Sequence, residues 1–526
     1  MNQPVTITRT SFRENFTKDF FASIVVFLIA LPLCMGIAIA SGVPPALGLI
    51  TGIVGGLVVG AIAGSPLQVS GPAAVLTVLV WEIIQQHGIG MLGAIVLLSG
   101  LMQLLMGALK MGQWFRAISP AVIQGMMAGI GVLIIASQIH VMLGDAPKGS
   151  GLTNLLSIPE ALYKGVMPLD GSSYQVAAAI GLVTMGLVLL WTYAPKKLQV
   201  VPAPLAAIAL VTIGVMLFGI QVKHVNVSNN LFSAVNVLTI ESLGNWLNLS
   251  VVGSAVALCF VASAQTLLCA TAVDRMHNGE RAEYNKELMA QGVGNSICGL
   301  IGALPMSGVI VRSSANINAG AKTRASSILH GAWILGLVVL APFILNRIPT
   351  TALAAILVYV GFKLLSPKAV RELHQFGWQE VAIFFATLVG IVATNLLTGV
   401  LLGLGLALLK LLYMFSHLET QVHDESRPNE MTISLIGAAT FVRLSTLASV
   451  LESAEAGDMV KLDIDRMWYI DHACLDLISD WRKQHISRGG QIIVNWEELQ
   501  RRNQDHEAAL TLAPKPTLVT ANASGD

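Results

Sequence analysis

Long hydrophobic runs, separated by short polar segments, dominate this chain from about Phe20 to Ser416. Many of these runs reach the roughly 20 residues that an α-helix needs to cross a bilayer, and some are shorter. The pattern therefore predicts about fourteen membrane segments. They begin near Phe20, Ala46, Ala73, Met91, Ile118, Tyr174, Ala203, Leu249, Glu287, Ser313, Ser326, Thr351, Val381 and Leu397.

Composition supports a membrane protein. Of the 526 residues, 54% are hydrophobic and only 12% are charged, about half the charged fraction of a soluble domain. The net charge of +1 gives no reason to expect a nucleic-acid partner. The first hydrophobic run is long and follows a polar segment, 1–19, so we expect a retained helix rather than a cleaved signal peptide. The five cysteines show no metal or disulfide spacing and are expected to pack as small apolar side chains.

Lysine and arginine gather in alternate loops, which predicts the orientation of the chain. With the N-terminus inside, the segments expected outside hold only Lys148, Lys164, Lys223 and Arg347. This asymmetry predicts an even number of crossings and two cytoplasmic termini.

The pattern changes after the last hydrophobic run. Residues 417–429, "HLETQVHDESRPN", are expected to be a linker, and residues 430–503 a small α/β domain. Its β-branched stretches "EMTISLIG", "DMVKLDID" and "QIIVNW" predict strands. The segments "STLASVLESAEAG" and "HACLDLISDWRKQHISRGG" predict helices that end at glycine. The tail, 504–526, is expected to be disordered.

Two stretches at corresponding positions in the two halves interrupt the hydrophobic pattern. "SPLQVSGPAAVLTVLV", from Ser65, and "SGVIVRSSANINAG", from Ser307, each combine a short β-like run with a following helix. Interrupted segments at matching positions are typical of the central site of a transporter. Unpaired backbone is not tolerated inside a bilayer, so the two runs are expected to pair with each other.

Arg312, in the second stretch, is a lone cation in a very hydrophobic region. A helix that begins inside the membrane presents unpaired N–H groups and a partial positive charge. Gly71 and Pro72 suit the start of the first helix, and Arg312 is expected just before the second. Two facing helix starts with a cation favour an anion. In the alternative reading, Arg312 neutralises a helix C-terminus or pairs with a distant acid, and Ser313 and Ser314 only cap the helix.

Gln265 is a polar residue in the middle of the hydrophobic run "CFVASAQTLLCATAVD". It is either a hydrogen-bonding residue between helices or part of the site, and the residues alone leave both open. His140 and His330 also lie near hydrophobic segments, and we expect structural roles for them.

Three segments resemble the sulfate permease (SulP) family, the bacterial branch of the anion-exchanger superfamily that includes prestin. They are "ALPLCMGIAIASGVPPALGL" from Ala30, "VSGPAA" from Val69 and "KELMAQGVGNSICGLIGALPMSGVIVRSSANINAGAKTR" from Lys286. The C-terminal unit resembles the STAS domain of that family. The resemblance implies two inverted repeats of seven segments over residues 20–416, divided into core and gate domains. It also implies an elevator motion, a homodimer and a bacterial inner-membrane location.

The same resemblance implies a small inorganic anion as substrate, with sulfate and bicarbonate foremost. It implies an anion site at Ala73, Ala74, Arg312, Ser313 and Ser314, with Leu33 and Ile37 as side walls. No cofactor is implied. The motifs are most similar to members found beside or fused to carbonic anhydrases, which suggests a functional link to such an enzyme.

Two positions depart from the family. Many bacterial members carry a carboxylate where this chain has Gln265, and a neutral amide neither changes charge nor holds a cation as an aspartate does. Coupling to Na⁺ or protons is therefore in question. The STAS loop often has a serine or threonine after the aspartate, whereas here His472 follows Asp471.

The sequence leaves other transport functions open. An uncoupled anion channel would suit Gln265, and a dicarboxylate or nucleobase transporter would share the fold. A non-transporting sensor would act through the STAS unit. No nucleophile–base arrangement or metal cluster is found, so an enzyme is not expected.

Overall fold

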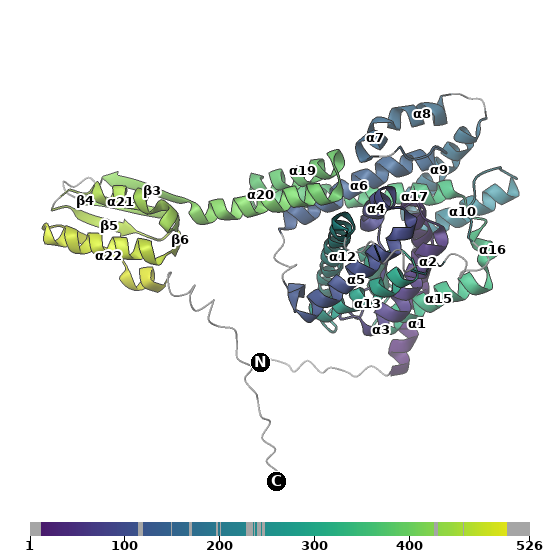
Figure 1. Cartoon of the computed structure of the whole chain (residues 1–526), viewed down its shortest axis with the longest axis horizontal. Helices are drawn as coiled ribbons and strands as arrows, with labels where there is room; N and C mark the ends of the chain where they lie inside the picture. Colours follow the sequence, from purple (N-terminus) through teal and green to yellow (C-terminus); the bar gives the residue numbers. More distant parts are fainter. Residues whose placement is uncertain are drawn as a thin grey trace, which may run out of the picture. The chain divides into compact units, whose positions relative to one another are not determined.

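The computed structural model describes residues 12–113, 119–148, 150–167, 171–195, 198–199, 201–227, 235, 237–238, 244, 248–424, 430–455 and 457–501. The chain divides into two compact units, Met1–Leu404 and Gly405–Asp526 (Figure 1). The first eleven residues of the expected N-terminal segment, residues 425–429 of the expected linker and the expected disordered tail lie outside the described residues.

The first unit is a bundle of hydrophobic helices. In the described part, eight helices are long and hydrophobic enough to span a membrane, and three shorter hydrophobic helices accompany them. With α13 and two segments interrupted by short strands, they make up the fourteen expected segments. The first half consists of α1 (Phe12–Ala40), α2 (Pro45–Val54) continued by η1 (Gly55–Val59) and α3 (Gly60–Ile62), β1 (Ser70–Pro72) with η2 (Ala74–Leu76) and α4 (Thr77–His87), α5 (Ile89–Ala108), α6 (Pro120–Met142), α9 (Ser173–Leu190) and α10 (Ala203–Leu217).

The second half has the same order of elements. It consists of α12 (Leu249–Met276), α13 (Tyr284–Leu300), β2 (Met306–Gly308) with α14 (Ile310–Asn318), α15 (Ala325–Leu340), α17 (Thr350–Leu364), α19 (Trp378–Ala393) and α20 (Leu396–Ser416). Short connecting helices are α7 (Gly151–Leu156), α8 (Ile158–Val166), η4 (Trp191–Tyr193), α16 (Pro342–Leu345) and α18 (Pro367–His374).

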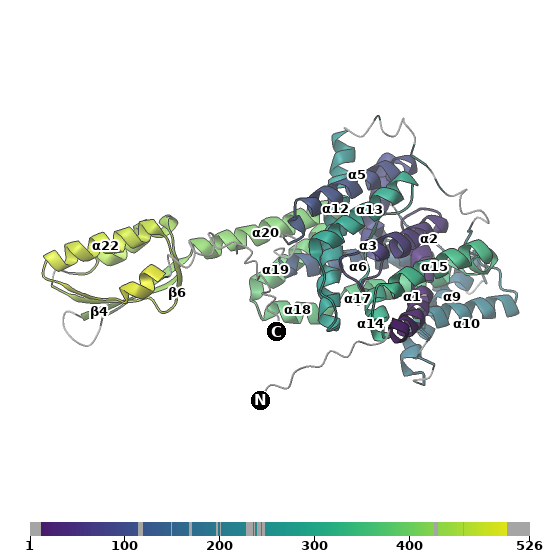
Figure 2. The same ribbon diagram turned by 90° about the horizontal axis from the view of Figure 1, so that it is seen from below.

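The packing of the helices is reciprocal between the two halves. Helix α5 packs against α13, and its counterpart α15 packs against α2 and η1. In the same way, α6 contacts α19 while α17 contacts α9, and α1 contacts α15 while α12 contacts α5 (Figure 2). The pairs α6–α17 and β1–β2 are their own counterparts. The fold is therefore built from two repeats of seven segments.

The two short strands pair with each other, as the sequence predicts. They are antiparallel, with Ser70 opposite Gly308 and Pro72 opposite Met306. The amide of Val309 continues the ladder to the carbonyl of Val69, at 3.0 Å. This pairing satisfies backbone groups that would otherwise be costly inside a bilayer.

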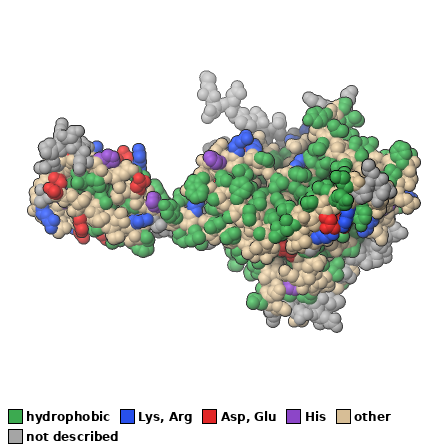
Figure 3. Space-filling view, turned by 90° about the horizontal axis from the view of Figure 1, so that it is seen from above, with side chains coloured by type: hydrophobic (Ala, Val, Ile, Leu, Met, Phe, Trp, Pro, Cys, Tyr) green, Lys and Arg blue, Asp and Glu red, His purple; other side chains and the backbone are tan. Residues whose placement is uncertain are grey.

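The surface of the first unit fits a membrane protein. Hydrophobic side chains cover a large part of the first unit in Figure 3 and few charged side chains lie among them, whereas lysine, arginine, aspartate and glutamate are frequent on the C-terminal unit. Exposed leucine, valine and phenylalanine side chains occur on α9, α10, α19 and α20. Many exposed apolar side chains are expected where a protein borders lipid tails.

The C-terminal unit is an α/β domain with a mixed five-stranded sheet in the order β3-β4-β5-β7, with β6 also paired to β4. Its core includes Ile433, Leu435, Leu447, Val460 and Ile478, all at most 1% exposed, and α21 packs against α22. The fold agrees with the expected STAS domain. The elements are β3 (Leu418–Asp424), β4 (Glu430–Ala439), η6 (Phe441–Arg443), α21 (Leu444–Glu452), β5 (Met459–Asp463), β6 (Met467–Ile470), α22 (His472–Ser487) and β7 (Gln491–Ile493).

The expected linker is wrong over most of its length. Residues Leu418–Asp424 form strand β3, which pairs antiparallel with β4 from Leu418 opposite Gly437 to Asp424 opposite Met431. Leu418 is buried in the core of the domain. The polar residues that alternate with the apolar ones made this segment resemble a linker, although such alternation is also typical of a strand with one face in solvent.

Candidate functional site

The two half-helices begin in the same way on either side of the strand pair. Ala73 is extended (φ −113°, ψ 135°) immediately before η2, and Val309 is extended (φ −112°, ψ 108°) immediately before α14. The first amides of each helix have no acceptor within the helix. Pro72, expected as a first helical residue, is instead the last residue of β1, because pairing with β2 extends the strand through it.

A small cavity of about 60 Å³ lies against both helix starts. Its volume admits a small anion or a few water molecules. Six of the residues expected at the site line this cavity: Leu33, Ile37, Ala73, Ala74, Gln265 and Arg312. Met127 of α6 and Val360 and Leu364 of α17 also line it, and sequence reasoning missed all three because nothing distinguishes them from other apolar helix residues.

Arg312 lies in the first turn of α14 rather than before it, and it is fully buried. Its Nη2 donates to the carbonyl oxygen of Pro72, at 3.3 Å, whereas Nε and Nη1 have no hydrogen-bond partner in the described part of the chain. No acidic side chain among the described residues pairs with it. The alternative of a helix C-terminus or an acid as partner is therefore not supported.

Gly71 makes room for this arginine. A Cβ atom at residue 71 would stand 2.4 Å from Nη1 of Arg312, far inside van der Waals contact. The sequence predicts a helix start at Gly71 and Pro72; in the structure the missing side chain of Gly71 leaves space for the guanidinium.

The serine hydroxyls expected at the site have other partners. Ser313 is buried, its Oγ donates to the carbonyl of Val309 at 2.8 Å, and it accepts from the amide of Val69 at 2.9 Å. The Oγ of Ser314 donates to the carbonyl of Val311 at 3.1 Å. Neither residue lines the cavity. Their hydroxyls hold the start of α14 and the end of the strand pair in place.

Gln265, from the middle of α12, lines the same cavity as the two helix starts. It is 4% exposed, and its Oε1 has no hydrogen-bond partner among the described residues. The side chain therefore belongs to the cavity wall and offers it an unused polar atom.

A stripe of polar side chains on α13, which sequence reasoning missed, fixes both strands from behind. We call Glu287, Gln291 and Asn295 the polar stripe; all are at most 1% exposed. Glu287 accepts from the amide of Ser65 at 2.9 Å and from Nε2 of Gln68 at 2.7 Å.

The rest of the polar stripe reaches β1 and β2 themselves. Gln291 donates to Oγ of Ser70 at 2.6 Å, and Asn295 accepts from the amide of Met306 at 2.7 Å and donates to its carbonyl at 3.1 Å. The spacing i, i+4, i+8 on a helix within the membrane was the available sequence signal.

A second, larger cavity of about 430 Å³ adjoins the small one. Both are lined by Met127, Gln265 and Ile310, and the larger one extends along α12 to Arg275, near the end of that helix. The small cavity therefore continues toward the side of the bundle that carries Arg275.

Comparison with known proteins agrees with this architecture. The profile of the sulfate permease family matches residues 16–387. The chain is 30% identical to a Bacillus subtilis protein named "Putative sulfate transporter YvdB", covering 94% of each chain. It is 24% identical to the bicarbonate transporter BicA of Picosynechococcus, covering 79% of this chain and 73% of BicA.

Solved structures share the fold. The transmembrane domain of a cyanobacterial bicarbonate transporter BicA is 25% identical, with a TM-score of 0.65, covering 75% of this chain and 99% of that one. Murine Slc26a9, an anion transporter solved in the inward-facing state, is 14% identical with a TM-score of 0.74 over 94% of this chain and 89% of that one. By its sequence and its transmembrane fold, the chain belongs to the sulfate permease family.

Proposed function

We propose that this chain is a secondary transporter of a small inorganic anion, sulfate or bicarbonate, in the bacterial inner membrane. The observation that carries the proposal is the buried Arg312, unpaired with any acid in the described part, at a cavity bounded by two helix starts. A buried cation is costly unless it meets an anion. The partial positive charges of both helix starts add to that attraction.

Recognition of the anion rests on the backbone as much as on side chains. The first-turn amides at Ala74 and Ile310 have no acceptor within their helices, and the alanines leave the backbone of the first helix start open to the cavity. Nε and Nη1 of Arg312 supply further donors after a small rotation. The names of the relatives, which include sulfate and bicarbonate transporters, support both anions as substrates.

Transport requires that the site open to each side of the membrane in turn. We infer an elevator motion, in which the strand pair and both half-helices move as one body because hydrogen bonds join them. The cavity that leads toward Arg275 supports a cytoplasmic opening, since the arrangement of basic residues places that end inside. Both termini are then cytoplasmic, and a homodimer with the STAS units inside the cell is part of this proposal.

The test is flux through the reconstituted full chain. Proteoliposomes are loaded, and uptake of labelled sulfate, bicarbonate and fumarate is measured with and without Na⁺ and pH gradients. We expect saturable uptake of sulfate or bicarbonate that is stimulated by the same anion on the far side. The absence of saturable flux for every anion under every gradient would refute a transporter.

An uncoupled channel is the second candidate, favoured by the neutral Gln265 at the cavity. A channel gives flux that follows the membrane potential and is not stimulated by unlabelled anion on the far side. Measuring uptake with and without unlabelled anion on the far side therefore distinguishes a channel from a transporter.

A further inference from the structure

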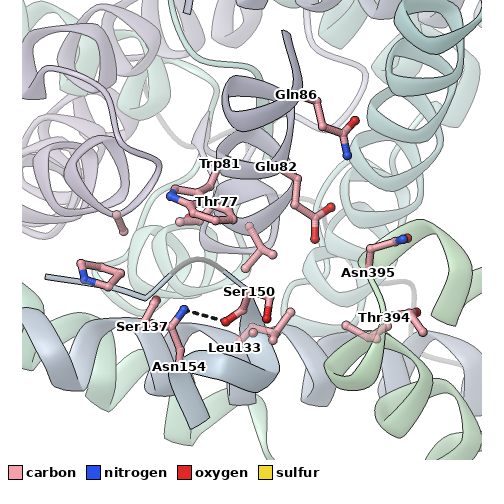
Figure 4. A pocket seen from close by; sticks show the side chains of 15 residues that line it. Thr77, Trp81, Glu82, Gln86, Leu133, Ser137, Ser150, Asn154, Thr394 and Asn395 are labelled. Carbon is pink, nitrogen blue, oxygen red and sulfur yellow. Dashed lines mark hydrogen bonds between the residues drawn. The ribbon is translucent and has the colours of Figure 1, made fainter. Parts of the chain in front are cut away.

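A cavity of about 250 Å³, separate from the anion cavity, lies along α4 from Thr77 to Gln86. Figure 4 shows Glu82 extending from α4 into this space, on the side of Thr394 and Asn395. Opposite α4, the cavity is lined by α6 and α7 and by the break between α19 and α20. Helices α6, α7 and α19 pack against one another. The cavity therefore lies between the half-helix of the anion site and a separate group of helices.

Glu82 has no hydrogen-bond or ion-pair partner among the described residues, although it is partly buried. None of the other residues that line the cavity is ionisable. A carboxylate in a transmembrane segment is a candidate functional group, and this one is left unused by the anion site.

The ionisable groups on the surrounding elements are engaged or distant. His87, next on α4, lies 3.1 Å from Oγ of Ser254, and α5 carries no ionisable residue. His140 of α6 lies 3.0 Å from the carbonyl of Asn154, and Lys148 lies 3.6 Å from Asp145. The remaining groups lie toward the far ends of their helices: Glu14, Lys18 and Asp19 on α1, Asp274 and Arg275 on α12, Glu380 on α19, and Lys410 on α20.

We propose that Glu82 binds the proton that accompanies the transported anion, and that the anion is a strong-acid anion of the sulfate class. This inference rests on the proposed transport function. Glu82 and the anion-facing residues Ala73 and Ala74 belong to one interrupted segment, so both move when that segment moves. Burying the carboxylate against α6 and α19 is cheaper when it is neutral. The proton is taken up by the carboxylate on one side of the membrane and released on the other.

The chemistry of the cavity favours a proton over a divalent metal cation. A proton needs one carboxylate oxygen, whereas Ca²⁺ and Mg²⁺ sites often use more than one carboxylate, and Glu82 is the one carboxylate among the residues that line the cavity. The hydroxyl and amide oxygens of the lining could also serve Na⁺, so the test includes Na⁺. Coupling to a proton also favours one class of anion. A proton carried with bicarbonate yields carbonic acid and then CO₂, which crosses the bilayer unaided, so the proton gradient could not maintain a bicarbonate gradient. Sulfate keeps its charge in the neutral range.

The test compares the full-length protein with Glu82→Gln, Glu82→Asp and Glu280→Gln in proteoliposomes. Gln copies the neutral, protonated carboxyl, Asp keeps the titratable group, and Glu280 is an exposed loop acid that serves as the control. Two assays use labelled sulfate. Exchange at equal pH measures anion movement, and uptake driven by an acidic exterior measures coupling. A pH-sensitive dye inside the vesicles records proton entry when sulfate is added.

We expect the wild type and Glu280→Gln to accumulate sulfate under a gradient of two pH units, with a limit of about 100-fold per coupled proton. Glu82→Gln keeps exchange within about twofold of wild type, a change below 1 kcal/mol, but loses accumulation and proton entry. Glu82→Asp retains both at a shifted pH.

Three results overturn the proposal. In the first, the wild type exchanges sulfate but does not accumulate it under a pH gradient, and in the second its accumulation of sulfate needs Na⁺ instead of protons. In the third, Glu82→Gln is folded but either accumulates sulfate as the wild type does or loses sulfate exchange. Thermal unfolding in detergent establishes that the variant is folded. In contrast, absence of any wild-type anion exchange refutes the transport function itself, so the two failures are distinguishable.

Discussion

The guanidinium of Arg312 donates from Nη2 to the carbonyl oxygen of Pro72, 3.3 Å away, and so joins the second half-helix to the strand that leads into the first. The two residues are 240 positions apart in the sequence. Nη2 holds the strand, while Nε and Nη1 have no hydrogen-bond partner among the described residues and are the donors that we propose for the anion.

Replacing Arg312 with Ala is expected to weaken anion affinity by about 10- to 100-fold, since charge-assisted hydrogen bonds contribute about 1.5–3 kcal/mol. Arg312→Lys keeps the charge but cannot reach Pro72 and the anion at once, so an intermediate loss is expected. Concentration dependence of exchange in proteoliposomes gives the apparent affinity. Unchanged affinity of Arg312→Ala for every transported anion would make the arginine purely structural.

Gly71→Ala tests the packing of the arginine without removing it. The new Cβ would stand 2.4 Å from Nη1, so the guanidinium must leave its preferred rotamer at a cost of about 1 kcal/mol. We expect affinity to fall about fivefold with little change in thermal stability. Gly186→Ala is the matched control, since nothing lies within 4 Å of its added Cβ. Equal affinities in both variants would contradict the role of Gly71.

Gln265→Glu introduces a carboxylate at the anion cavity. A negative charge there repels the substrate, whereas the protonated acid resembles the native amide. We therefore expect exchange by this variant to be slower than wild type at pH 8 and to recover toward pH 6, as the carboxyl gains its proton. Gln265→Asp extends the comparison, and each variant is measured with and without Na⁺. If the pH dependence of exchange by both variants parallels that of the wild type, residue 265 does not affect anion binding or transport.

Glu287→Ala removes the acid of the polar stripe that holds Ser65 and Gln68. Three buried donors, the amide of Ser65 and the Nε2 atoms of Gln68 and Gln291, lose their acceptor, at about 1–3 kcal/mol each, so a strong loss of thermal stability is expected. Thermal unfolding of the purified protein in detergent measures it, with the exposed Glu280→Ala as the control. A melting temperature equal to that of the control would mean that Glu287 of the polar stripe does not stabilise the fold.

The sequence predicted the segments and the pairing of the two interrupted runs, because hydrophobic periodicity and the matching positions of "QVSGPAA" and "SGVIVRSS" are local signals. The roles of individual polar groups depended on partners far along the chain. Ser313 was expected at the anion site, and its hydroxyl bonds the backbone of Val309 and Val69. Pro72 was expected at a helix start, and it pairs with Met306 as part of β1.

The walls of the anion cavity and the edge strand of the C-terminal unit could not be predicted from local sequence either. Met127 and Val360 resemble any other membrane residues, and only the packing of α6 and α17 brings them to the anion cavity. In β3, Leu418, Thr420 and Val422 alternate with the polar residues Glu419 and Gln421. By contrast, the spacing of Glu287, Gln291 and Asn295 was readable in advance.

The strand pair has a consequence for how the protein is made. Pro72 is synthesised 240 residues before Arg312, which at about 5–20 residues per second is about 10 to 50 s. Throughout that interval β1 has no partner strand, and the polar backbone of the first half-helix start must be sheltered by the insertion machinery or by water. The strand pair that bounds the anion cavity can therefore form only after both repeats have been synthesised, so the first repeat must enter the membrane before this part of the fold exists.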